Sequence, residues 1–242
     1  MAGALGWGAL ASSSLVIGAL LALGRRWSER QVGVVLAFGA GALISAVSFE
    51  LAGEGLQVGG LGATAVGLAA GALTYFCLDG MIAQRFSAGR SRSGRSQGGD
   101  AGTALALGAF LDGIPEQLVL GIGLAAGEGV SVGLLVAIFV SNLPEAIGSA
   151  SEMRAAGTAR CGVLVLWCAV AAICTLASVA GYGIADLTSG DLRAAIDGFA
   201  AGALLVMLID SMIPDATREL GRSAGLATTF GFAVATALSS VS

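Results

Sequence analysis

The chain has 242 residues, of which 56% are hydrophobic and 12% charged, and its mean hydropathy is +0.88. A soluble domain carries about 25% charged residues, so this composition excludes an ordinary soluble protein and indicates an integral membrane protein. All twelve basic residues are arginine, histidine is absent and the net charge is −4, so there is no basic footprint for nucleic acid. The 39 glycines suit helices that pack closely in a lipid bilayer.

Eight segments are long and apolar enough to cross the hydrocarbon core, which takes about 20 residues of helix. The first lacks the basic n-region of a secretory signal peptide, since its arginines follow the apolar run. We therefore expect a retained helix with its N-terminus outside. The predicted helices cover residues 6–24, 32–53, 60–81, 102–125, 130–152, 162–184, 194–214 and 224–241.

The arginines predict the orientation of the bundle. With the N-terminus outside, the loops after the first, third, fifth and seventh helices are cytoplasmic, and they hold every arginine except Arg193. This distribution follows the positive-inside rule. We therefore predict a single polytopic domain over residues 1–242 in the cell membrane, with both termini outside. The Gly-, Ser- and Arg-rich segment 82–101 is expected to be a flexible cytoplasmic loop.

Three acidic residues, Asp112, Glu116 and Glu145, fall near the middle of their predicted helices. A carboxylate at the centre of a transmembrane helix costs about 2.5–3.5 kcal/mol, so these side chains should face the bundle interior, a wet cavity or a cation, or be protonated. Asp112 and Glu116 are four residues apart and share one helix face. Ser141 and Glu145 repeat this spacing on the next helix, with Asn142 at the edge of the same face.

A proline precedes each of the two glutamates, in "DGIPE" and "SNLPE". Proline removes one helical hydrogen bond, so Pro115 and Pro144 should free a carbonyl oxygen close to each acid. Carbonyl and carboxylate oxygens suit a cation, and a motif repeated on antiparallel helices is typical of a mid-membrane transport site. Kinks and single acids also serve packing, and Ser141 and Asn142 fit hydrogen bonding as well as ligation. The third proline, Pro214, is expected to end the seventh helix.

The doubled Pro-Glu motif and the predicted topology together resemble the ZIP (Zrt/Irt-like) family of divalent metal transporters. The family signature in helix four is similar to His-Asn-x-Pro-Glu-Gly, where this chain reads "DGIPEQ". The stretches "FGAGALISAVSFELAGEG" and "FAAGALLVMLIDSMIPDA" also resemble the family's second and seventh helices. The resemblance implies an all-α bundle of eight transmembrane helices in a pseudo-symmetric 3+2+3 arrangement. It also implies rigid-body movement of helices one, four, five and six against the other four.

Several positions depart from the family pattern. Asp112 stands where the family has a metal-binding His, and Gly113 where it has Asn. Cys174 aligns with a bridging glutamate, and Glu50 with a position that can hold an outward-facing His. Glu116 and Glu145 carry over unchanged. A second metal would need ligands at Gly113, Asn142 and Cys174, of which Gly113 offers no side chain.

We therefore expect transport of a divalent cation toward the cytoplasm, with the ion as substrate and no cofactor. The resemblance implies zinc, iron or manganese as the transported ion. The absence of His shifts the expectation toward harder ions such as manganese or iron without excluding zinc, because the expected ligands offer oxygen atoms: Asp112, Glu116, Glu145, Ser141 and Asn142. Metal entry should release protons. A proton-coupled or non-metal carrier and a non-transporting metal sensor are the alternatives, whereas an enzyme is the least expected class.

Two further features have alternative interpretations. The small-residue stretches 39–42 and 200–203 suit either a homodimer interface or packing within the chain. Asp210 could join a hydrogen-bond relay or lie at the membrane interface beside Pro214.

Overall fold

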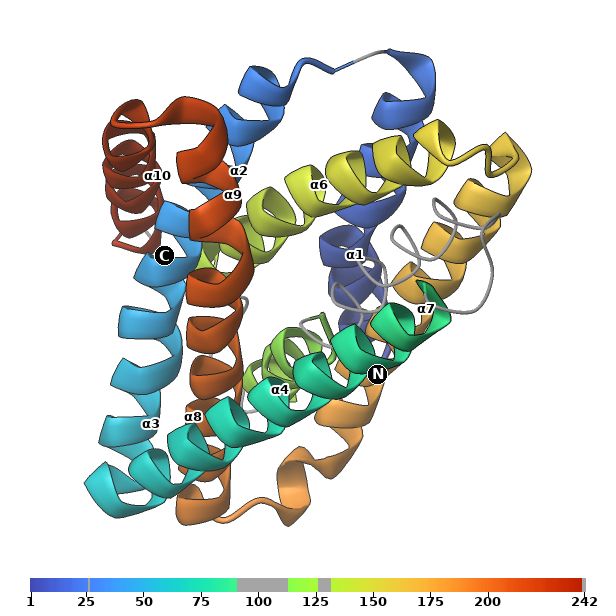
Figure 1. Ribbon diagram of the computed structural model, residues 1–242. Helices are drawn as coiled ribbons and strands as arrows, with labels where there is room; N and C mark the ends of the chain where they lie inside the picture. Colours follow the sequence, from blue (N-terminus) through green and yellow to red (C-terminus); the bar gives the residue numbers. More distant parts are fainter. Residues whose placement is uncertain (26, 91–112, 126–131, 241–242) are drawn as a thin grey trace.

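The computed structural model describes residues 1–25, 27–90, 113–125 and 132–240, which are almost entirely helical (Figure 1). Every predicted transmembrane segment overlaps a helix, and the protein is a multi-pass integral membrane protein. The eight-span count stays a prediction, because residues 102–112 of the fourth segment lie outside the described residues. The orientation also stays a prediction, because it rests on the distribution of the arginines alone. Six helices are long and apolar enough to cross a membrane: Ala2–Gly24, Glu29–Val58, Gly60–Met81, Val132–Ala155, Arg160–Leu187 and Gly190–Leu220. Two apolar helices are shorter: Gly113–Ala125 and Ser223–Ser239.

Helix α1 (Ala2–Gly24) packs against both α6 (Val132–Ala155) and α7 (Arg160–Ile184). Glycines make these close approaches possible. A Cβ built on Gly18 would lie 2.7 Å from the Leu143 carbonyl oxygen of α6. Packing of this kind is usual in membranes, where small residues bring helix backbones together.

Two long helical rods run antiparallel beside each other, so that α2 contacts α9 and α3 contacts α8 (Figure 1). Each rod contains one π-helical turn between two α-helices, a feature that the sequence pattern did not predict. π-turns are rare and often occur at functional sites. The first rod consists of α2 (Glu29–Ser45), η1 (Ala46–Leu51) and α3 (Ala52–Val58); the second consists of α8 (Gly190–Met207), η3 (Leu208–Met212) and α9 (Ile213–Leu220).

Pro214 does not end the seventh helix, as the sequence had suggested. It lies in the first turn of α9, which continues the rod to Leu220. A proline is tolerated in the first turn of a helix because the N–H group it lacks needs no helical partner there.

The two rods have matching partners, since α10 (Ser223–Ser239) packs on α2 and α4 (Gly60–Arg90) packs on α8. A Cβ on Gly41 would collide with the Thr228 carbonyl oxygen of α10. A Cβ on Gly202 would collide in the same way with the Leu68 carbonyl oxygen of α4. The small-residue stretches 39–42 and 200–203 therefore serve packing within the chain.

Helix α4 continues to Arg90, past the predicted end of its span at 81. The first part of the predicted loop 82–101 is therefore helical, and residues 91–101 lie outside the described residues.

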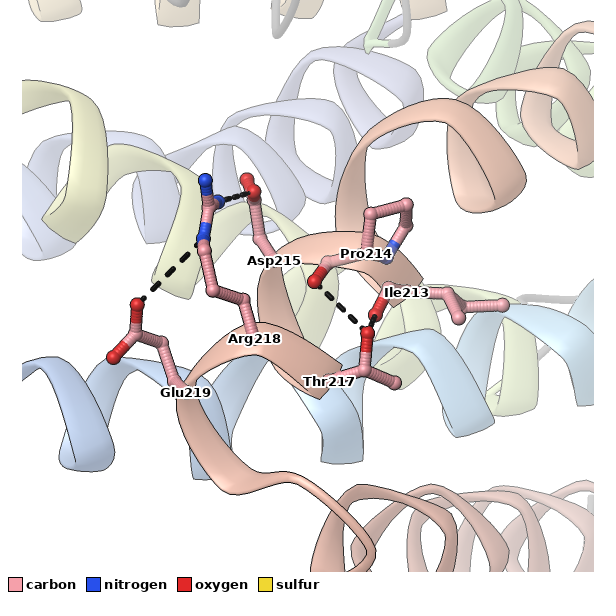
Figure 2. A network of polar contacts seen from close by, with 6 residues as sticks. All are labelled: Ile213, Pro214, Asp215, Thr217, Arg218 and Glu219. Atoms are coloured by element: carbon pink, nitrogen blue, oxygen red, sulfur yellow. Dashed lines mark hydrogen bonds and ion pairs between the residues drawn. The ribbon is translucent and has the colours of Figure 1, made fainter.

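Polar side chains gather on α9, beyond the apolar part of the second rod (Figure 2). The Thr217 hydroxyl lies 2.9 Å from the carbonyl oxygens of both Ile213 and Pro214. Arg218 pairs with Asp215, and its Nε lies 3.8 Å from a Glu219 carboxylate oxygen. These groups are suited to a membrane–water interface, where the predicted topology places this end of the rod.

Candidate functional site

The helix Gly113–Ala125 carries two adjacent polar side chains, Glu116 and Gln117, that are almost completely buried, at 1% and 0% exposure. The Oε2 atom of Glu116 has no hydrogen-bond partner among the residues that the structure describes. A buried carboxyl oxygen without a partner is costly, because it has lost its hydration and gained nothing in return. A bound proton or a nearby cation would therefore stabilise the buried Glu116 carboxyl group.

Glu145 of α6 is the second predicted acid, and the structure brings it to Glu116. The two carboxyl groups are close enough for their charges to repel each other. The Glu145 side chain is half-buried as a whole, but its Oε2 atom is fully buried and has no hydrogen-bond partner in the described ranges. Asp112, the third predicted acid, lies outside the described residues.

Ser141 and Asn142 lie on the same helix as Glu145 and are both buried. The Ser141 hydroxyl donates to the Ile138 carbonyl oxygen at 3.1 Å. Because the hydroxyl donates its proton in this bond, the lone pairs of its oxygen atom remain available to accept. The Ser141 side chain can therefore coordinate a cation with a lone pair of its hydroxyl oxygen.

Pro144 lies inside α6 and leaves the Val140 carbonyl without its helical N–H partner. The backbone of α2 meets this point at Gly39. A Cβ built on Gly39 would lie 3.2 Å from the Val140 oxygen and 3.3 Å from the Ser141 Cα atom. The glycine thus lets the first rod come close to the interrupted part of the helix that bears Glu145.

Within residues 1–25, 27–90, 113–125 and 132–240, no group of three or more His, Cys, Asp or Glu side chains is arranged to hold a metal ion. The acidic part of the site is thus the Glu116–Glu145 pair in the described residues. Further ligands would have to be hydroxyl, amide or carbonyl oxygens, which suit hard divalent ions.

Cys174 of α7 is buried and lies against Gly113, at the start of the described part of the acid-bearing helix. A Cβ on Gly113 would lie 2.6 Å from the Cys174 sulfur atom. The resemblance had placed both residues at positions of a second metal. In the structure they pack against each other, and the thiol fills the space of a side chain at 113.

Other ionisable residues lie apart from the Glu116–Glu145 pair. Glu50 of η1 accepts a hydrogen bond from Ser239 of α10, and Asp210 of η3 is exposed. Asp197 of α8 is 1% exposed and was not predicted, because it lies close to the expected start of its helix. Gln117 was also missed, since a single amide beside an acid gives no motif. Its position directly after the Pro-Glu pair was the available signal.

No family model matches the chain. The chain is 31% identical over 196 residues to an Arabidopsis thaliana protein named "Putative zinc transporter". This alignment covers 79% of the chain and 31% of the plant protein, so the chain spans about a third of the length of that relative. The aligned part is long enough to include most of the helices described above.

Proposed function

We propose that the protein transports a divalent metal cation across the membrane, with Glu116 and Glu145 as the central pair of its binding site. The cation is the substrate, and no resident cofactor is involved. The predicted ligands Asp112, Ser141 and Asn142 complete the proposed site. The direction, as the resemblance to the ZIP family implies, is toward the cytoplasm.

One observation carries this proposal: two buried carboxyl groups from different helices approach each other, and each has an oxygen atom without a hydrogen bond in the described residues. Two such groups destabilise an empty bundle, because like charges repel and buried charges lose hydration. A divalent cation between them would reverse both effects. Acidic residues retained inside a membrane at this expense usually mark an ion pathway.

Two further facts support the proposal. The relative at 31% identity is named as a zinc transporter. Val140, whose carbonyl is freed, and Ser141, whose oxygen can accept, lie on α6 little more than one helical turn before Glu145. This oxygen-rich set favours a hard ion such as manganese, while zinc and iron are the other expected substrates.

The test is uptake by purified protein in liposomes, with zinc, manganese, iron and cadmium offered separately. Glu116→Gln and Glu145→Gln keep the side-chain size and remove the charge, and each should lower uptake by more than about tenfold. Asp210→Asn is the matched control, because Asp210 is an acid on another helix whose side chain is exposed rather than buried in the proposed site. Uptake by either glutamine variant at the wild-type rate would overturn the site.

The same measurement separates the alternatives. A flux driven by a pH gradient and indifferent to every divalent ion would identify a proton-coupled or non-metal carrier. Metal binding without flux would identify a sensor.

A further inference from the structure

We propose that Gln117 is a positioning residue for the Glu116–Glu145 pair, acting by fixing the helix of Glu116 to α1. The inference rests on the proposed function, because it assigns a role to a residue beside the proposed site. Gln117 is not offered as a ligand. Its amide binds α1, and it influences cation binding only by fixing where the Glu116 carboxyl lies.

In the described residues the Gln117 amide forms hydrogen bonds only through its Nε2 atom, and both reach α1. Its Nε2 atom donates to the Ser12 hydroxyl oxygen at 3.0 Å and lies 3.5 Å from the Gly8 carbonyl oxygen. Gln117 is completely buried, and Ser12 is 1% exposed. A hydrogen bond between two helices in a bilayer has no water to compete with it, so it holds them in one register.

Helix α1 also touches the helix of the second acid. Gly18 meets α6 at Leu143 and Ala146, the residues on either side of Pro144 and Glu145. A Cβ on Gly18 would lie 2.7 Å from both the Leu143 oxygen and the Ala146 Cβ atom. One helix therefore contacts both acid-bearing helices, so fixing the helix of Glu116 to α1 restrains its position relative to the helix of Glu145.

Gln117 immediately follows Glu116 in a helix, so the two side chains point about 100° apart around the helix axis. Glu116 can therefore face Glu145 while Gln117 faces α1. Rotation or sliding of this helix would move both side chains together. Anchoring Gln117 thus restrains the Glu116 carboxyl, and binding sites need their ligands held within about 0.5 Å.

Ser178 of α7 provides a matched comparison. Its hydroxyl donates to the Ala4 carbonyl oxygen of α1 at 3.3 Å, one helical turn before Gly8, and it is as deeply buried as Gln117. The Ser178 hydroxyl bond ties α1 to α7, which carries neither glutamate. The Ser178 carbonyl oxygen also faces Gly121 on the helix of Glu116, but Ser178→Ala keeps this backbone contact and removes only the hydroxyl bond to α1. Loss of the Ser178 bond should affect the stability of the bundle without affecting the site.

The experiment compares Gln117→Met, Ser12→Ala and Ser178→Ala, with manganese and zinc as probes. KM and maximal rate of uptake are measured in liposomes, and thermal unfolding is measured in detergent. For Gln117→Met we expect KM to rise about tenfold, as when a partner outside the ligand shell is lost, with a fall in unfolding temperature no larger than that of Ser178→Ala. Ser12→Ala should raise KM in the same direction, and Ser178→Ala should leave it unchanged.

Three outcomes overturn the inference. Wild-type KM in both Gln117→Met and Ser12→Ala would show that the amide serves stability alone. An equal rise of KM in Ser178→Ala would show that any loss of packing on α1 suffices. If the wild-type protein binds and transports neither manganese nor zinc, nor any other divalent ion, the proposed function itself fails and the inference fails with it. Should Gln117→Met not fold, Ser12→Ala against Ser178→Ala decides the question.

Discussion

The sulfur atom of Cys174 occupies the space that a side chain at position 113 would need. A Cβ on Gly113 would lie 2.6 Å from this sulfur atom but 3.9 Å from the Cβ atom of Cys174. The conflict therefore involves the thiol alone. Two departures from the ZIP pattern, the glycine at 113 and the cysteine at 174, form one steric pair next to the proposed site.

This pair predicts a compensating substitution. Gly113→Ala should lower the free energy of unfolding by about 1–3 kcal/mol, because it overpacks a buried contact. Adding Cys174→Ala removes the sulfur atom and should restore most of the loss. Gly123→Ala on the same helix is the control, since a Cβ there meets nothing within 4 Å. Thermal unfolding in detergent measures all four proteins. A double variant as unstable as Gly113→Ala alone would contradict the prediction.

The Glu116–Glu145 pair predicts that metal stabilises the wild type but not a variant that lacks both acids. Without metal, Glu116→Gln/Glu145→Gln should unfold at a higher temperature than the wild type, because two repelling acids have been replaced by neutral groups. With the transported ion at 100 times its Kd, the wild type should gain about 2.7 kcal/mol and the double variant nothing. Unfolding temperatures of both proteins, measured by differential scanning calorimetry with and without metal, check both statements. An equal metal-dependent gain in both proteins would place the metal elsewhere.

Gly41 of the first rod and Gly202 of the second should be equally intolerant of a larger side chain. Gly41 and Gly202 each face a backbone carbonyl of the partner helix, which cannot move aside as a flexible side chain could. Alanine at either position should therefore destabilise the bundle by about 1–3 kcal/mol or prevent folding. Gly62 and Gly225 lie on the partner helices α4 and α10 in open surroundings, so alanine there should be tolerated. Yield and monodispersity in detergent give the readout. Normal behaviour of both rod variants would show that the helices can separate without loss.

Arg193 is the single arginine that the predicted topology places outside, and it pairs with Glu54, joining α8 to α3. The Arg193 side chain is 12% exposed and that of Glu54 is 33% exposed. A double-mutant cycle with Arg193→Met and Glu54→Gln should give a coupling free energy of about 1 kcal/mol, smaller at high salt. Unfolding of the four proteins at two salt concentrations measures this coupling. Additive effects of the two substitutions would show that the pair contributes no stability of its own.

Much of the architecture could be predicted from the sequence, because each membrane-spanning segment must satisfy its own backbone hydrogen bonds and be apolar over about 20 residues. These are local requirements, so every apolar segment predicted by counting overlaps a helix in the described residues. The π-turns η1 and η3 were not predicted, since a π-turn shifts the hydrogen-bond register without changing the apolar pattern. The continuation of the second rod past Pro214 was missed because residues 215–220 are mostly polar and follow a proline.

The residues that could form a site were recognisable from their positions along the chain. A glutamate in the middle of an apolar helix is expensive wherever it points, so Glu116 and Glu145 were identifiable from composition and position alone. The tertiary structure, in contrast, determines which of these polar residues meet. It brought the two glutamates together, turned Gln117 toward α1 and filled the space beside Gly113 with the Cys174 thiol. The rotation of each helix about its axis depends on contacts between segments far apart in the chain, and a local pattern does not contain that information.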